Sequence, residues 1–277
     1  MTANDSEPGE LLSFREHGSG MPVVFLHPTP LDHAYWLPLV ERLRGVRAIL
    51  PDLRGHGASP LGVDLPEGDF DLVPDAQVLS MHRLAADVLA LLDALKVQEA
   101  VFVGCSIGGY TLLELWRQAP ERMRGLAFVC SKPQPDSAIA RQKRLETILR
   151  ARNEGVAGIF DGQAESLVGA STRAQRPYVV AEVRARMTLT ARAVVAVQAG
   201  LAVRPDSLAT VATISAPVLA IAGGEDPGVS AEEMREFRNT SGQTEFHLLP
   251  DAGHFAAYER PEQVGKLLQK WLQPFQG

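Results

Sequence analysis

The feature that most constrains this chain is a regular alternation of short apolar runs with helix-like stretches. The runs lie at residues 23–26, 47–50, 100–103, 125–130, 217–222 and 244–249. Continuous apolar runs of this kind are typical of strands that are buried on both faces of a sheet. Between them, apolar residues repeat at three- and four-residue spacing, as in residues 81–95, which gives a helix one apolar stripe. Strands that alternate with helices predict an α/β fold with a mostly parallel, doubly wound sheet.

The composition is that of a globular chain with a large core. Of its 277 residues, 45% are hydrophobic and 22% are charged, so the chain can bury a core and wholesale disorder is not expected. The net charge is −6 and no block of Lys and Arg occurs, so we expect no nucleic-acid partner. The chain has two cysteines and an acidic N-terminus, and it lacks an apolar run of about 18 residues. These features predict a cytoplasmic protein without a disulfide scaffold, a signal peptide or a membrane partner.

Residues 133–210 interrupt the alternation. They are rich in Ala and Arg and show helical periodicity without a convincing strand, and the strand pattern resumes at Val218. We therefore expect a core domain made of residues 1–132 and 211–277, with residues 133–210 inserted as a helical cap, or lid, over a site. An ordinary helical excursion without a role in the site is the alternative.

A glycine-rich turn follows the apolar run at 100–103. A sharp strand-to-helix turn that exposes a nucleophile needs small residues two positions before and after it, because larger side chains collide with the neighbouring strand and helix. Gly104 and Gly108 meet this requirement when the turn is centred on Ser106, whereas the residues that flank Cys105 at this spacing are bulky. Ser106 is therefore the predicted nucleophile, at the positive end of the helix that follows. An idle serine in a glycine-rich turn is the alternative.

A serine hydroxyl needs a base to take its proton. His254 comes directly after the last apolar run, and Asp226 comes after the run before it. Parallel sheets place their sites at the carboxyl ends of the strands, so we predict His254 as the base and Asp226 as the carboxylate that orients it. Glu225 is expected to point elsewhere, and Asp251 is expected to form a turn. The resulting order Ser106, Asp226, His254 is one that this triad is known to take.

The oxygen of an attacked carbonyl needs N–H donors as its negative charge develops. One predicted donor is the N–H of Ile107, at the start of the helix after Ser106. A second is the N–H of Thr29, because its neighbours Pro28 and Pro30 have none. We expect His27 to hydrogen-bond locally and to shape this turn. For the lining of a substrate pocket we expect Trp36, Tyr110 and His27. The alternative for Trp36 and Tyr110 is that they only pack in the core.

Together these segments resemble the α/β-hydrolase superfamily. The segments that carry the resemblance are residues 25–30 with Trp36, 51–59, 104–109, 119–122, 223–226 and 252–254. The resemblance implies the α/β-hydrolase fold, with a helical cap inserted after the sixth strand, and it is strongest to the branch of serine esterases, 3-oxoadipate enol-lactonases and perhydrolases. Haloalkane dehalogenases and epoxide hydrolases carry an aspartate where this chain has Ser106. Two positions depart from the family pattern: Pro28 replaces the usual glycine, and the proline expected a few positions after Asp226 is displaced or missing.

These observations predict a serine hydrolase that cleaves a small-molecule carboxylic ester or lactone through an acyl-enzyme. Hydrolysis of a carbon–carbon bond, perhydrolysis and a lyase reaction on the same fold are alternatives, and a catalytically silent ligand-binding protein is a further one. No group of His, Cys and carboxylate residues has the spacing of metal ligands, and no phosphate-binding loop occurs, so we expect neither a metal nor a cofactor. A homodimer is one option for the assembly.

Overall fold

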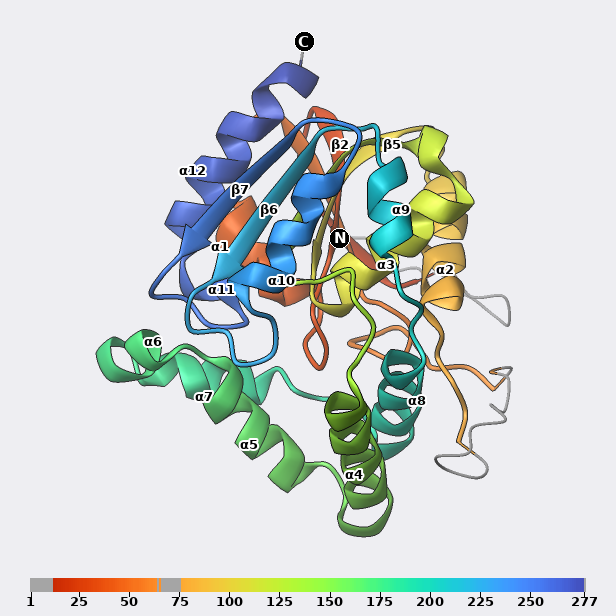
Figure 1. Ribbon diagram of the computed structural model, residues 1–277, viewed down its shortest axis with the longest axis vertical. Helices are drawn as coiled ribbons and strands as arrows, with labels where there is room; N and C mark the ends of the chain where they lie inside the picture. The colour runs from red at the N-terminus through yellow and green to blue at the C-terminus, as the bar shows by residue number, and fades with distance from the viewer. Residues whose placement is uncertain (1–11, 64, 66–75, 277) are drawn as a thin grey trace.

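The computed structural model describes residues 12–63, 65 and 76–276, and its centre is one seven-stranded sheet (Figure 1). The strand order is β1-β3-β2-β4-β5-β6-β7, and every neighbouring pair is parallel except β1 with β3. The strands are β1 (Phe14–Gly18), β2 (Met21–Leu26), β3 (Val46–Pro51), β4 (Ala100–Cys105), β5 (Met123–Val129), β6 (Val218–Gly223) and β7 (Thr244–Leu249). The predicted parallel sheet is thus confirmed.

The sequence prediction missed β1, which pairs antiparallel with β3 at one edge of the sheet. Four of its five residues are exposed, so the strand has no apolar run that could reveal it. By contrast, all residues of the central strands β4 and β6 are buried, which is why their apolar runs were visible.

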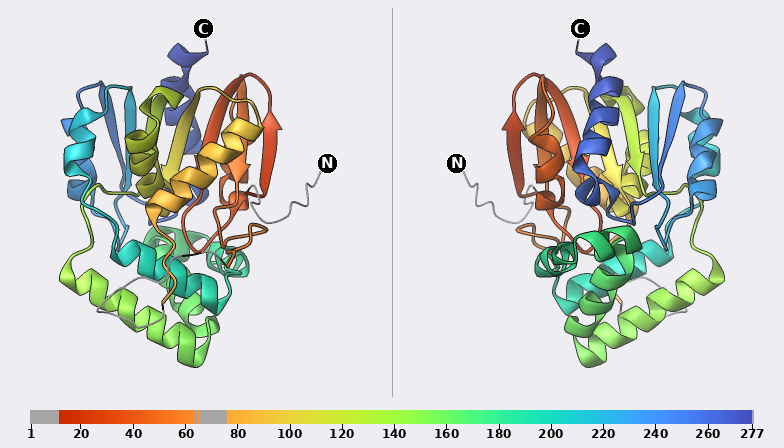
Figure 2. Two further views of the ribbon diagram at one scale, coloured as in Figure 1. Left: turned by 90° about the vertical axis from the view of Figure 1, so that its right-hand side faces the viewer. Right: turned by 90° about the vertical axis from the view of Figure 1, so that its left-hand side faces the viewer.

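Helices cover both faces of the sheet. α2 (Met81–Ala94) and α3 (Ile107–Gln118) pack on one face, with α9 (Leu208–Thr213) and α10 (Ala231–Arg235), whereas α1 (Leu37–Val40) and α12 (Pro261–Leu272) pack on the other (Figure 2). The short helix α11 (Ala256–Glu259) precedes α12. The stripe predicted in residues 81–95 is the buried face of α2. Short 3₁₀ turns at His33–Trp36, Pro120–Arg122, Glu236–Asn239 and Gln273–Phe275 complete the layers.

Five helices between β5 and β6 gather at one end of the sheet (Figure 1), and we call them the cap. They are α4 (Ala138–Glu154), α5 (Ala157–Leu167), α6 (Ala170–Gln175), α7 (Tyr178–Ala185) and α8 (Ala191–Ala202). Five strands precede the cap in the described part of the chain, so it follows the fifth strand there and not the sixth, which corrects that expectation. α9 crosses the expected boundary at residue 210 and packs against α3 of the core. A role of the cap as a lid stays a prediction.

Candidate active site

The turn at Ser106 joins β4 to α3 in a strained conformation. Ser106 has φ +53° and ψ −118°, a region that non-glycine residues rarely adopt. A Cβ atom on Gly104 would lie 2.6 Å from the backbone carbon of Gly108, and one on Gly108 would lie 2.2 Å from the carbonyl oxygen of Leu26. Both positions therefore need glycine, and this supports a turn centred on Ser106.

The side chain of Cys105, the residue before Ser106, is fully buried. The hydroxyl of Tyr35 donates to its sulfur at 3.3 Å, and the thiol faces the carbonyl oxygen of His254 at 3.7 Å. Burial raises the pKa of the Cys105 thiol, which disfavours the reactive thiolate. The contact with His254 also places the predicted base next to the residue that precedes Ser106.

The predicted acid and base meet in a hydrogen bond. Nδ1 of His254 lies 2.8 Å from Oδ2 of Asp226, whose other oxygen accepts from the amides of Gly228 and Val229 at 2.8 and 3.1 Å. A carboxylate only accepts, so Nδ1 carries the proton in the neutral ring and Nε2 is free to take another. As expected, Glu225 does not contact the imidazole and accepts instead from the amide and hydroxyl of Ser171.

The turn that carries Thr29 is fixed by the carbonyl of Pro28. This oxygen accepts from the amide of Leu31 at 3.0 Å and faces Nδ1 of His27 at 3.1 Å. A trans peptide is planar, so the N–H of Thr29 points away from that carbonyl. Among the described residues, neither the amide of Thr29 nor that of Ile107 has an acceptor, which is the condition that an oxyanion donor requires.

Two buried histidines connect this turn to the loop after β3. Nε2 of His27 accepts from the amide of Leu53 at 2.9 Å. His56 lies on the loop and connects back to the turn. Its Nδ1 donates to the carbonyl of Arg54 at 3.0 Å, so its Nε2 accepts from the hydroxyl of Thr29, also at 3.0 Å. Burial lowers the pKa of His27 to about 4 and that of His56 to about 3. Both rings are therefore neutral near pH 7.

The role of His56 in this connection was not predicted from the sequence. The only available signal was its place in the segment 51–59, which carries part of the family resemblance. Its partner Thr29 is far away in the sequence, and a pairing of this kind depends on the fold.

The structure corrects the expectation that Trp36 and His27 line a substrate pocket. The exposed fraction of both side chains is 0%, so neither presents surface to a ligand. Trp36 packs instead against Phe25 and Tyr35, with ring centroids at 5.4 and 4.7 Å.

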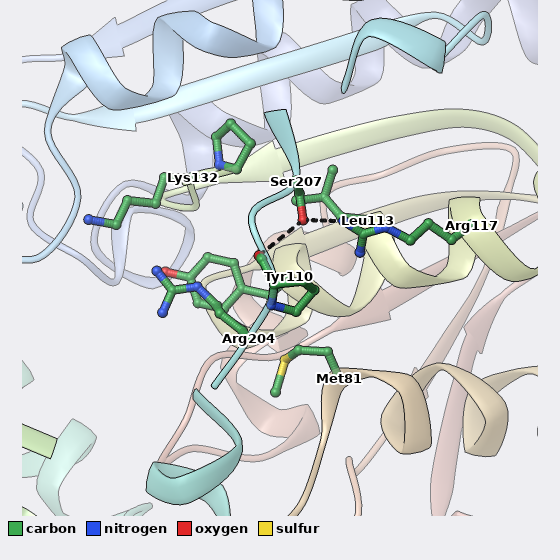
Figure 3. Close-up of a pocket in the computed structure, with 9 residues that line it drawn as sticks. Met81, Tyr110, Leu113, Arg117, Lys132, Arg204 and Ser207 are labelled. Carbon is green, nitrogen blue, oxygen red and sulfur yellow. Dashed lines mark hydrogen bonds between the residues drawn. The ribbon is translucent and has the colours of Figure 1, made fainter. Parts of the chain in front are cut away.

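Tyr110 borders a cavity of about 10 Å³ beside α3 (Figure 3). The guanidinium of Arg204 lies 4.4 Å from the centre of its ring. The residues around this cavity are Met81, Tyr110, Leu113, Arg117, Lys132, Pro133, Arg204, Pro205 and Ser207. The space suffices for about one water molecule and not for an ester. This cavity alone therefore does not hold a substrate, and a place for Tyr110 in the lining of a substrate pocket stays a prediction.

No group of His, Cys, Asp and Glu residues in the described part of the chain is arranged to hold a metal ion. The helices described there are also too short or too polar to cross a membrane.

The fold agrees with comparisons to known proteins. The family model of the alpha/beta hydrolase fold matches residues 21–261, and the chain belongs to this family. Among curated proteins it is similar to 3-oxoadipate enol-lactonase 1 of Acinetobacter baylyi, with 28% identity over 97% of this chain and 93% of the relative.

Two solved structures extend the likeness. A thermophilic esterase from Thermogutta terrifontis, with malate bound, superposes with a TM-score of 0.87 and 31% identity, over 98% of this chain and 97% of that one. Est816, described as an N-acyl homoserine lactone degrading enzyme, superposes with a TM-score of 0.73 and 28% identity, over 94% and 97% of the two chains.

Proposed function

We propose that this protein is a serine hydrolase that cleaves a carboxylic ester or lactone through an acyl-enzyme on Ser106. The observation that carries the proposal is the 2.8 Å bond between Asp226 and Nδ1 of His254. It leaves Nε2 unprotonated, on a loop that contacts the turn of Ser106 through Cys105. A base in this state is what a serine nucleophile requires.

The residues then act in sequence. His254 takes the proton of Ser106 as the oxygen attacks the carbonyl carbon, and Asp226 stabilises the imidazolium that forms. The amides of Thr29 and Ile107 donate to the oxyanion, and loss of one such donor costs about 3 kcal/mol of transition-state stabilisation. His254 next gives its proton to the leaving alkoxide and then activates the water that releases the acid.

The relatives support this class of reaction, because their names describe an enol-lactonase, an esterase and a lactone-degrading enzyme. The substrate we propose is a small ester or lactone that binds between the cap and the core.

The test combines a substrate panel with covalent labelling. Purified protein is assayed on aryl esters, lactones and β-diketones and for peroxyacid formation, and it is incubated with an organophosphonate followed by mass spectrometry of the labelled peptide. We expect ester or lactone turnover and a label on Ser106. In Ser106→Ala the label disappears and kcat falls by about 10⁴-fold or more. The control is Ser166→Ala, which changes an exposed serine of the cap and is expected to retain the label and the wild-type kcat.

Turnover of β-diketones alone would favour the carbon–carbon hydrolase instead. An unlabelled wild-type protein without turnover would support the silent ligand-binding alternative.

A further inference from the structure

The cap contacts the loops of both the predicted acid and the predicted base through one short segment, residues 167–172. The carbonyl of Leu167 accepts from the amide of His254 at 2.9 Å. Ser171 donates from its amide and its hydroxyl to Glu225, at 2.8 and 2.5 Å. Because Glu225 directly precedes Asp226, the same cap segment is bonded to the backbone of the base and to the neighbour of the acid.

Glu259 lies at the centre of these contacts, at the end of α11, and its exposed fraction is 0%. Its Oε2 accepts from the amide of Gly169 at 3.0 Å and from the hydroxyl of Thr172 at 2.7 Å, and its Oε1 accepts from the amide of Gly253 at 3.1 Å. No cationic side chain forms an ion pair with it in the described part of the chain. A buried charge is costly unless it is compensated, and here hydrogen bonds from the cap and from the base loop compensate it.

The backbones at this junction are in direct contact. A Cβ atom on Gly253 would lie 2.3 Å from the nitrogen of Gly169, and one on Gly169 would lie 2.7 Å from the nitrogen of Gly253. The two segments therefore have no room to shift toward each other. A displacement of Gly169 on the cap side therefore displaces Gly253, the residue before His254.

We propose that Glu259 is a positioning residue for His254 and that it acts through the cap segment 167–172. The proposal rests on the proposed function. Glu259 holds the amide of Gly253 directly, and by holding Gly169 it keeps the carbonyl of Leu167 on the amide of His254. With the backbone fixed on both sides and Nδ1 bonded to Asp226, the direction of Nε2 is set.

One consequence is that this end of the cap cannot lift without releasing the base.

The variant Glu259→Gln conserves the volume and replaces one acceptor oxygen by an NH₂ group. The amide of Gly253 lies 3.1 Å from Oε1 and also 3.2 Å from Oε2. An NH₂ group at the Oε2 position therefore faces the donors of Gly169 and Thr172, and one at the Oε1 position faces the amide of Gly253, so either placement opposes two donors and disturbs the junction. We expect kcat and the rate of organophosphonate labelling of Ser106 to fall together by about 100-fold, because a displacement of a catalytic group by about 1 Å has an effect of this size. KM is expected to stay unchanged, because Glu259 is fully buried and does not touch the substrate.

A second pair of variants tests the same junction from the cap side. Thr172→Val removes the hydroxyl that donates to Glu259, whereas Thr172→Ser retains it. We expect Thr172→Val to slow labelling and turnover, and Thr172→Ser to restore both to the wild-type rates. This pair decides the question if Glu259→Gln does not fold.

The matched control is Asp136→Asn. Asp136 is also buried and pairs with Arg144 and Arg204, both at 2.5 Å, so it ties the cap together without contacting the loops of Asp226 or His254. We expect it to lower stability and to leave the labelling rate of the folded protein unchanged. Wild-type rates in Glu259→Gln or Thr172→Val, or an equal loss in Asp136→Asn, would overturn the positioning role. The two proposals can fail separately. Absence of labelling and turnover in the wild-type protein would contradict the proposed function, whereas the positioning role is tested by the rates of the variants relative to those of an active wild type.

Discussion

Acidification is expected to destabilise the protein through the two histidines that connect the oxyanion turn to the loop after β3. Burial lowers the pKa values of His27 and His56 from 6.5 to about 4 and about 3. The unfolded chain therefore binds protons below pH 6.5 that the folded chain does not. The contribution of these two neutral histidines to the free energy of unfolding is fully present above pH 6.5, the pKa of histidine in the unfolded chain. It decreases as the pH falls below 6.5, and the decrease levels off below the folded pKa values of about 4 and about 3.

The magnitude follows from the same shifts. Between pH 7 and pH 5, each histidine lowers the free energy of unfolding by about 2 kcal/mol, at 1.36 kcal/mol per pKa unit, so the pair accounts for about 4 kcal/mol. Both rings are buried, so solvent screening reduces this figure little. Other groups add their own pH dependence, and a variant is needed to isolate this one.

His56→Gln provides that variant, because the glutamine oxygen can accept from the hydroxyl of Thr29 but does not titrate. Urea unfolding followed by circular dichroism at pH 7 and pH 5 gives the loss of stability for each protein. We expect the loss to be about 2 kcal/mol smaller in His56→Gln than in the wild type. His17→Gln removes an exposed imidazole on β1 and controls for the loss of one histidine as such. An equal loss in wild type and His56→Gln would show that His56 takes up its proton in the folded state, and the argument from burial would be wrong.

Two further substitutions test the turn and the acid. Gly108→Ala places a Cβ atom 2.2 Å from the carbonyl oxygen of Leu26, so we expect the free energy of unfolding in urea to fall by about 3 kcal/mol or more. The control Gly162→Ala lies inside α5, where a Cβ atom meets no atom within 4 Å, and it should raise the free energy of unfolding by about 0.5–1 kcal/mol. Equal effects of the two substitutions would refute the steric argument. In Asp226→Asn, the side-chain oxygen still accepts hydrogen bonds from the amides of Gly228 and Val229, and the NH₂ group faces Nδ1 of His254. The ring is thereby forced to carry its proton on Nε2, and kcat should fall by about 10⁴-fold without loss of fold; near-normal turnover would show that the tautomer does not matter.

Much of the fold was predictable because its central strands are buried on both faces. Their apolar runs identified them, and the glycines around Ser106 could be assigned by spacing alone, since each position has only one sterically acceptable residue. The strand β1 was not predictable, because an exposed antiparallel edge strand with Arg15, Glu16 and His17 has no apolar pattern.

The candidate site was predictable to the extent that it follows strand ends. Asp226 and His254 both come directly after apolar runs, and the structure joins them in a hydrogen bond. Glu259 and His56 were not predictable, because their roles depend on partners from distant segments that only the folded chain brings together. The expectation for Trp36 failed for a related reason, since an aromatic residue near a motif can equally well pack in the core.

The bonds between segment 167–172 and the base loop bear on how the specificity of this scaffold can be altered. Helices α4, α7 and α8 have no hydrogen bond to the loop of residues 250–255 in the described part of the chain, so substitutions on their surfaces leave the bonds that hold His254 intact. A chimera that also replaces residues 167–172 has to bring a matching acceptor for the amide of His254. Recombination points for new substrate ranges therefore belong on either side of this segment.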